Sequence, residues 1–392
     1  MESSTARWLV SPAAQAYLAH VRQLPDPASL RVATELRRRL TAEQAAAVVT
    51  LETLRRQGRR KLGNLSDRLY LTRDGLEQAT RWPVAAWRAG RLAAAGAERV
   101  IDAGCGLGID ALACAGAGLG VVGVERDEVT AILARANLPG AAILHQAIEQ
   151  TDFDDWLADP ATALFLDPAR RTVRGRSWAL SDLSPSWETV TALLDRAVGP
   201  AAVKLAPGFP YDHLPDRADV TWVSHGRELV ETTVWTGPTA AGRRQAVVLA
   251  PEQVEPAILD VAGAALPLGP IEAYVFDPDP AVNRARGGGT LAQLLGAHGL
   301  ADGIAYLSGP APRRTPLADS FAVIETLPYS EANLRAWTQA HDIGAIEIKL
   351  RGLEIDPADL RRKLKLTGKN HTLVILTPTI SGAQIIVAER LA

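Results

Sequence analysis

Between Arg99 and Trp235 the chain alternates short apolar runs with segments of helical pattern, and this alternation restricts its fold more than any other feature. The apolar runs are VIDAG (100–104), VVGVE (121–125), IL (143–144), ALFLD (163–167) and AAVKLAP (201–207). Strands and helices that alternate in this way are typical of a parallel sheet with helices on both faces. The sequence therefore predicts an α/β fold with a Rossmann-like, doubly wound core.

The segment before this core has the residue pattern of helices. Thr41 and Gln44 resemble a capping box that opens a helix at Ala42, and Gly58 and Gly63 are predicted to end that helical region. A short strand is predicted over LYL (69–71), followed by a turn at residues 74–75. We expect residues 1–78 to form an N-terminal helical region.

The length of the chain and the pattern beyond residue 78 indicate further domains. A chain of 392 residues exceeds what one hydrophobic core usually serves. We assign 79–238 to the α/β core, closed by an antiparallel hairpin over 221–235. After a linker rich in glycine and proline, mixed strand and helix patterns predict two small α+β units over 239–316 and 317–392.

Charge and cysteine content limit the compartment and the cofactors. The formal net charge of −2 argues against a surface that is positive throughout, although local basic patches remain compatible with it. Cys105 and Cys114 cannot build a disulfide framework or a four-ligand zinc site, so we expect no metal and a reducing compartment. Without a signal-peptide pattern or an apolar run of about 20 residues, we expect the cytoplasm and no membrane.

A glycine-rich turn follows the first strand of the core. The strand delivers Asp102, and the turn GCGLG (104–108) contains Gly104, Gly106 and Gly108. Glycines at such a turn let the backbone approach a ligand and bend sharply into a helix. Glu125 ends the second strand, where a carboxylate can accept hydrogen bonds from both ribose hydroxyls of a nucleotide. These features predict a nucleotide-cofactor site, the alternative being a turn that serves only helix packing.

The residues around the turn favour S-adenosylmethionine over a dinucleotide. A nicotinamide or flavin site would carry G-x-G-x-x-G, but its third glycine would fall at Ile109. Asp102 is well placed to hold the ammonium group of a methionine moiety, directly or through water. Many class I methyltransferases carry an Asp after the third strand that meets the adenine amine. Here Gln146 is the residue predicted to accept a hydrogen bond from that amine.

The fourth strand ends as LDPARR (166–171), which predicts the site of the acceptor. Asp167 and Pro168 resemble the D/N-P-P-aromatic motif of nucleic-acid methyltransferases that act on nitrogen, where a side-chain oxygen and a backbone carbonyl bind the target amine. Ala169 and Arg170 replace the second proline and the aromatic residue, so the motif lacks its local stacking partner. We predict catalytic roles for Asp167 and Pro168, with Asp167 also beside the cofactor; the alternative for Asp167 is a loop cap.

Further residues are predicted to contact the substrate. Arg170 and Arg171 follow the acceptor motif directly, and Lys204 ends the fifth strand on the ligand-bearing edge of the sheet. Lys204 would contact a phosphate or the acceptor, or else be a solvated strand-end lysine. Trp187, in the PSW segment (185–187), would bring an aromatic ring near the acceptor, although a tryptophan in this position is more often part of the core.

Together these segments resemble a bacterial group of class I S-adenosylmethionine-dependent methyltransferases with a C-terminal THUMP-like domain. The resemblance rests on GLEQATRWPVAAWRAGRL (75–92), the glycine turn, LDPARR, PSW, KLAPG (204–208), AYVFDPDPAVNRA (273–285) and AIEIKLRGLEIDPADLRRKLKL (345–366). It covers nearly the whole chain and implies a ferredoxin-like unit over 239–316 and a THUMP-like domain over 317–392. Because THUMP domains proper belong to RNA-modifying enzymes, it also implies an RNA substrate, with a base nitrogen of tRNA or rRNA as the expected acceptor.

Three basic clusters agree with an RNA partner. They comprise Arg55, Arg56, Arg59, Arg60 and Lys61; Arg170, Arg171, Arg174 and Arg176; and Arg361, Arg362, Lys363, Lys365 and Lys369. Phosphate contacts need such clusters even when the overall charge is near neutral, although any one of them alone is more often a solvated helix face. The alternatives are a methyltransferase for a small molecule or a protein, and a non-catalytic binding module. No obligate protein partner is evident.

Overall fold

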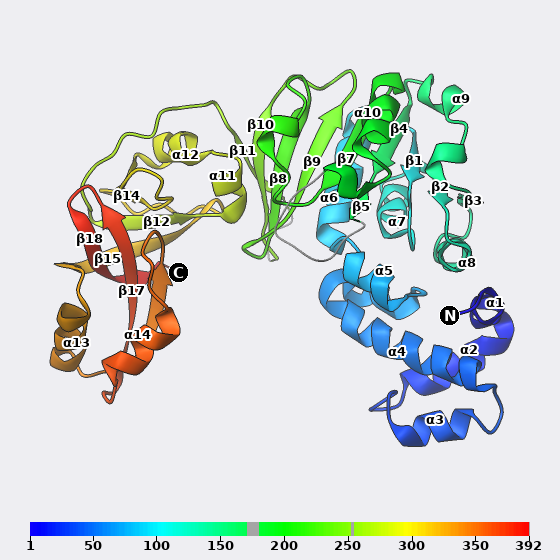
Figure 1. Cartoon of the computed structure of the whole chain (residues 1–392), viewed down its shortest axis with the longest axis horizontal. Helices are drawn as coiled ribbons and strands as arrows, with labels where there is room; N and C mark the ends of the chain where they lie inside the picture. The colour runs from blue at the N-terminus through cyan, green and yellow to red at the C-terminus, as the bar shows by residue number, and fades with distance from the viewer. Residues whose placement is uncertain (171–179, 252–254, 392) are drawn as a thin grey trace. The chain divides into compact units, whose positions relative to one another are not determined.

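The chain forms two compact units in a computed structural model that describes residues 1–170, 180–251 and 255–391. The first unit contains residues 1–219 and 232–242, and the second contains residues 220–231 and 243–391. Figure 1 shows the helices and strands of both units, most of them labelled. Among the residues that the structure describes, no helix is both long enough and apolar enough to cross a membrane.

The first unit begins with a bundle of helices. They are α1 (Ser3–Val10), α2 (Pro12–Arg22), α3 (Leu30–Leu36), α4 (Ala42–Leu62), η1 (Gly63–Arg68), α5 (Arg73–Gln78) and α6 (Trp82–Ala94). The predicted capping box is confirmed, because the Thr41 side chain accepts from the backbone of Gln44 and the Gln44 side chain accepts from the backbone of Thr41. Helix α4 ends where Gly63 adopts a φ of +57°, which favours glycine.

Three local predictions in this region were wrong. Gly58 lies inside α4, where a Cβ would come within 2.3 Å of the Ser66 Oγ, so this glycine permits close packing of η1. Residues 69–71 form irregular backbone in place of a strand, and Leu69 and Leu71 are buried in the helical core. The predicted turn at residues 74–75 belongs to α5, because the Thr72 side chain caps that helix at Gly75.

The predicted doubly wound core is confirmed. It contains β1 (Arg99–Ala103), α7 (Ile109–Gly116), β2 (Gly120–Glu125), α8 (Glu128–Asn137), β3 (Ala142–His145), η2 (Ile148–Gln150), α9 (Asp154–Leu157), β4 (Thr162–Leu166), β5 (Ala169–Arg170), η3 (Leu180–Asp182), β6 (Leu183–Ser184), α10 (Trp187–Arg196), β7 (Ala201–Leu205) and η4 (Tyr211–His213). The strand order is β3-β2-β1-β4-β7 with all neighbours parallel, followed by residues 232–236 of β9 (Glu228–Thr236) antiparallel to β7.

The apolar runs of the sequence fill the middle of this sheet. Every residue of β4 is buried, as expected for a parallel strand covered on both faces. Helices α6 and α7 pack together against the sheet through a shared apolar core. The right-handed rule for crossovers between parallel strands predicts α7 and α8 on one face of the sheet and α10, which joins β4 to β7, on the other. Because β1, β2, β3, β4 and β7 are parallel, the strand ends that the sequence predicted to carry ligands all lie at one edge of the sheet.

Asn137 ties the helical bundle to this core. It is the last residue of α8 and is buried, and its Oδ1 accepts from the Tyr70 backbone N–H at 2.7 Å. Its Nδ2 donates to the Tyr70 carbonyl at 3.0 Å and to the Leu107 carbonyl at 2.9 Å. One side chain thus satisfies backbone groups of the extended segment after η1 and of the glycine turn after β1.

The second unit contains two sheets. Its elements are β8 (Asp219–His225), the first part of β9, β10 (Arg244–Leu249), β11 (Ala257–Asp260), β12 (Tyr274–Pro278), α11 (Pro280–Arg284), α12 (Gly288–Leu295), β13 (His298–Gly299), β14 (Leu307–Gly309), β15 (Ala318–Pro328), α13 (Glu331–Ala340), β16 (Ile343–Leu350), α14 (Pro357–Leu364), β17 (Asn370–Thr379) and β18 (Gly382–Arg390). Strand β10 pairs in parallel with β8 and antiparallel with β11. A seven-stranded sheet, in the order β13-β14-β12-β15-β18-β17-β16, joins the two segments that the sequence separated at residue 317.

Alternation along β17 divides the apolar residues of this larger sheet between its two faces. Val374 and Leu376 pack with the side chains of α13 and α14 in one apolar core. Leu373 and Ile375 belong to a second core that includes Phe321. This period of two is what a strand covered on both faces requires.

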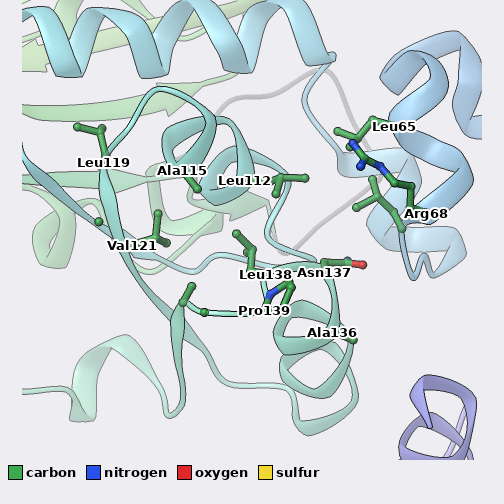
Figure 2. A pocket seen from close by; sticks show the side chains of 14 residues that line it. Leu65, Arg68, Leu112, Ala115, Leu119, Val121, Ala136, Asn137, Leu138 and Pro139 are labelled. Carbon is green, nitrogen blue, oxygen red and sulfur yellow. The ribbon is translucent and has the colours of Figure 1, made fainter. Parts of the chain in front are cut away.

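A groove in the first unit lies at the amino ends of β2 and β3 (Figure 2). Its volume is about 620 Å³, and its apolar lining includes Leu65, Leu112, Ala115, Leu119, Val121 and Leu138. Since the glycine turn follows the carboxyl end of β1, this groove belongs to the opposite edge of the sheet and is not the predicted cofactor site.

We expect Asn137→Ala to destabilise the first unit, because the substitution leaves buried backbone groups of Tyr70 and Leu107 without their partner. An unsatisfied buried group costs about 1–3 kcal/mol, which for a unit of this size lowers the melting temperature by about 2–10 °C. Thermal unfolding followed by fluorescence measures the change. The control is Asn64→Ala, an exposed position in η1. Equal melting temperatures for the two variants would contradict this role of Asn137.

Candidate active site

The three glycines of the turn have backbone conformations that other residues rarely adopt. Their φ angles are +95° at Gly104, +54° at Gly106 and +79° at Gly108. A Cβ on Gly108 would lie 2.3 Å from Leu138, so this glycine allows α7 to approach α8. A Cβ on Gly104 would meet only the Ile148 side chain, at 3.5 Å. The turn therefore keeps one side of its backbone accessible to a ligand.

Glu125 braces this turn from the end of β2. Its Oε2 accepts from the backbone N–H of Gly106 at 3.0 Å, and its Oε1 accepts from that of Asp127 at 2.8 Å. Each carboxylate oxygen can accept a second hydrogen bond. The carboxylate is thus fixed in place beside the turn and retains acceptor capacity for the two hydroxyls of a ribose.

Asp102 is a buried acid without a compensating partner. Its side chain is 1% exposed, and within the described part of the chain neither of its carboxylate oxygens has a hydrogen-bond partner. Burial, together with the nearby carboxylates of Asp110 and Asp167, holds the pKa of Asp102 well above its ordinary value. Burying a carboxyl group without a partner lowers the stability of the fold unless a ligand supplies a positive charge or hydrogen-bond donors. We propose that the ammonium group of the cofactor does so.

A polar network that the sequence did not predict lies beside Asp102. Arg88 on α6 is 2% exposed, forms an ion pair with Asp110, and lies with its guanidinium 4.6 Å from the centre of the Phe165 ring. Thr80 donates to the same carboxylate at 3.0 Å. The signal for this network was an arginine among the apolar residues of α6 together with an acid in the first turn of the next helix. The charge of Arg88 is therefore balanced by the Asp110 carboxylate.

Gln146, predicted to meet the adenine, follows β3 at the same edge of the sheet. Its backbone N–H donates to the Glu125 carbonyl at 3.1 Å, and its side chain is exposed. Ile148, which the sequence did not single out, lies next to Gly104 and adds an apolar side chain there. We propose that Gln146 accepts from the adenine amine while Ile148 packs against the ring.

Asp167 and Lys204 lie side by side because their strands are neighbours. Strands β4 and β7 pair in parallel, with Leu166 opposite Val203. The Lys204 Nζ donates to the Asp167 Oδ2, with 16% and 33% of the respective side chains exposed. Lys204 was predicted to contact the substrate itself; the structure shows that it contacts Asp167. Pro168, beside them, is buried.

The remaining predicted residues have different outcomes. Arg171, Arg174 and Arg176 lie outside the described residues, and for Arg170 the structure gives the backbone, which pairs with Leu183. Both cysteines are free and buried, and burial raises the pKa of the Cys114 thiol to about 12 and that of the Cys105 thiol further. Neither cysteine supplies a thiolate at neutral pH.

Comparison with known proteins agrees with this geometry. Two curated relatives, uncharacterised S-adenosylmethionine-dependent methyltransferases from the CDC 1551 and H37Rv strains of Mycobacterium tuberculosis, are each 33% identical over 360 residues, which span 87% of this chain and 95% of the relative. A family model described as THUMP domain-like matches residues 318–390, and a domain of unknown function, DUF8688, matches residues 2–58. The crystal structure of a protein from Porphyromonas gingivalis W83, provisionally described as a methyltransferase, has the same fold: the TM-score is 0.78 at 23% identity, over 99% of this chain and 98% of that one.

The doubly wound sheet, its glycine turn and these relatives define a class I methyltransferase whose cofactor is S-adenosylmethionine. The chain belongs to the family of class I S-adenosylmethionine-dependent methyltransferases that carry a C-terminal THUMP-like domain, as its sequence predicted.

We expect Asp102→Asn to weaken cofactor binding, measured by calorimetry, by about 100-fold or more, because a buried charge–charge contact is lost. The fold should survive, because the carboxylate that is lost makes no hydrogen bond among the described residues. The folded-state pKa of Asp102 is raised, so the carboxylate lowers the stability of the ligand-free protein as the pH rises through that pKa. The variant should therefore melt no lower than wild type. Asp155→Asn, an exposed acid on α9, is the control.

Cofactor affinity should increase with pH. Because the pKa of Asp102 is raised, the carboxyl is neutral at pH values where an ordinary aspartate is ionised, and binding the cofactor's ammonium then releases a proton. Below that pKa, Kd should fall by up to about tenfold per pH unit, and Asp102→Asn should lose this dependence. Calorimetry between about pH 5 and about pH 7 stays below the range where the cofactor's own amine titrates. A wild-type Kd that does not change over this range would count against ammonium binding by Asp102.

Proposed function

We propose that this methyltransferase modifies RNA, at a base nitrogen of tRNA or rRNA, and that residues 317–392 help to bind the RNA. The observation that carries the proposal is an exposed basic surface on the THUMP-like region, together with an Asp-Pro acceptor motif at the end of β4. The free, buried state of Cys105 and Cys114 supports a reducing compartment, and we place the activity in the cytoplasm.

The basic surface belongs to α14 and the segment after it. In that part of the chain, Lys363 pairs with Glu331 and Arg362 with Asp359. Among the residues that the structure describes, Arg361, Lys365 and Lys369 form no ion pair, and all three side chains are exposed. Cations that are not neutralised internally can bind phosphates and release counterions from RNA. These three residues are our candidates for phosphate contacts.

The N-terminal cluster contributes less to the proposal than its sequence suggests. Arg55 and Arg59 form ion pairs with acids of the same region. Arg56 and Lys61 donate to backbone carbonyls. Since these contacts satisfy most of its charge, we assign this cluster to the stability of the helical bundle.

Asp167 is our candidate for the residue that holds the acceptor. Its Oδ2 accepts from Lys204, and a carboxylate has further acceptor capacity on Oδ1 for a hydrogen bond from an N–H group of a base. When bound at the glycine turn, S-adenosylmethionine supplies a methyl group activated by a sulfonium sulfur. A nitrogen lone pair aligned with that methyl would form the new N–CH₃ bond as the S–CH₃ bond breaks and S-adenosylhomocysteine leaves, and one N–H proton would pass to the Asp167 carboxylate. Alignment of the reacting atoms supplies most of the rate in such a displacement. An Asp167 carboxylate held in place by Lys204 would provide this alignment by binding an N–H group of the base.

Transfer of labelled methyl into total RNA from a strain that lacks this gene tests the proposal. Wild-type enzyme should label this RNA, RNA from the parent strain should take up little label, and Asp167→Ala should lower the rate by about 100-fold or more. Calorimetry should show that Asp167→Ala still binds the cofactor. Cofactor binding without label in RNA would favour a protein or small-molecule acceptor. Activity retained after deletion of residues 240–392 would remove the reason for inferring RNA.

RNA affinity should depend steeply on salt. Replacing Arg361, Lys365 and Lys369 with alanine should reduce the slope of log affinity against log salt by about two, as expected for three lost phosphate contacts. Fluorescence anisotropy with labelled RNA measures the slope. The matched control replaces Arg37, Arg38 and Arg39, three exposed arginines near the end of α3, and changes the net charge equally. Equal slopes for the two triple variants would contradict a specific role of the THUMP-like surface.

A further inference from the structure

The acceptor motif lacks an aromatic residue after Asp167-Pro168, and the fold supplies one from another segment. We propose that Trp187 is the platform on which the acceptor base stacks, so that the substrate presents a planar heteroaromatic ring. This inference rests on the proposed function, since only a nucleobase acceptor needs such a platform.

Strand pairing brings Trp187 to the acceptor motif. Strand β5 directly follows Pro168, and it pairs antiparallel with β6, with Ala169 opposite Ser184. Three residues after Ser184, Trp187 begins helix α10, whose first turn is capped by the Ser186 side chain. The pairing therefore returns the chain to the acceptor motif three residues before Trp187.

A second contact fixes this segment near the cofactor site. The Arg126 guanidinium donates to the Ser184 Oγ at 3.5 Å, and Arg126 directly follows Glu125 at the end of β2. The segment that carries Trp187 is thus held at β4 by backbone pairing and at β2 by a side chain. Both attachments lie at the carboxyl edge of the sheet, where the cofactor and the acceptor must meet.

The indole ring itself is supported from the loop after β7. Its centre lies 5.1 Å from that of Phe209, at an interplanar angle of 45°. Phe209 is fully buried and follows Lys204 by five residues, in the loop that leaves the strand beside β4. Trp187 is only partly buried. One part of the ring therefore packs on a buried support, while another part remains accessible.

The chemistry fits a stacking role. Stacking of a base on an aromatic side chain contributes about 1–3 kcal/mol and needs no particular base edge. Asp167 would then bind one N–H group in the plane of the ring, and Trp187 would fix the plane. Together they restrain both the position and the tilt of the acceptor nitrogen, which an in-line displacement requires.

The experiment compares Trp187→Leu, which keeps an apolar side chain, with Trp187→Phe, which keeps an aromatic face. With RNA as substrate, Trp187→Leu should lower kcat/KM by about 10–100-fold, mainly through KM, and Trp187→Phe should stay within about threefold of wild type. Calorimetry should give both variants a wild-type affinity for S-adenosylmethionine, which separates loss of stacking from loss of the fold.

The control is Trp156→Leu. Trp156, on α9, is also partly buried and packs at a tilt on a buried phenylalanine, Phe153, with ring centres 6.3 Å apart. It precedes β4 and so belongs to the opposite edge of the sheet. If wild type labels RNA and Trp187→Leu keeps the wild-type KM, the stacking role is overturned while the proposed function stands. If wild type labels no RNA, the proposed function fails and this inference fails with it.

Discussion

The buried carboxyl group of Asp102 is the constraint on which the rest of this site depends. The fold places an acid in the centre of a parallel sheet without a hydrogen-bond partner among the described residues, and it holds Arg88 in an ion pair with Asp110. Burial of apolar side chains in the strands and in the helices packed on them offsets the free energy that this unpartnered acid costs the fold. In our proposal, the ammonium group of the cofactor would turn this unfavourable group into a favourable contact. We therefore propose that the site binds an ammonium where a protein optimised for stability alone would place a neutral residue.

Neighbouring strands extend this arrangement from the cofactor to the acceptor. Glu125 ends β2, Asp102 lies in β1, Asp167 follows β4 and Lys204 is in β7, in the order of the sheet. Since parallel strands have their carboxyl ends at one edge, the topology alone brings four charged groups into one row. The helical bundle is joined to this site, because the Asn137 side chain binds the backbone of both the glycine turn and the segment after η1. Small shifts in the bundle would therefore reach the cofactor turn.

The sequence predicted those features that follow from local pattern. Apolar runs of β1, β2, β4 and β7, the glycine turn and the Thr41 capping box each have a signal within a few residues. Features that depend on distant partners had no such signal. At residues 69–71 the pattern of buried leucines predicts a strand, but the leucines are buried by helices. Gly58 lies within its helix, where it leaves room for Ser66. The contact of Lys204 with Asp167 and the packing of Trp187 on Phe209 likewise needed the pairing of strands far apart in the chain.

The most direct test is a crystal structure with S-adenosylhomocysteine, the demethylated product, which retains the ammonium and the ribose. We expect the ammonium nitrogen to lie about 2.7–3.2 Å from an oxygen of Asp102 and the ribose hydroxyls to donate to Glu125. Its sulfur should face the side of the site where Asp167 and Trp187 lie. A ligand bound in the apolar groove at the amino ends of β2 and β3, or a bound ligand that leaves both Asp102 oxygens without a partner, would contradict it.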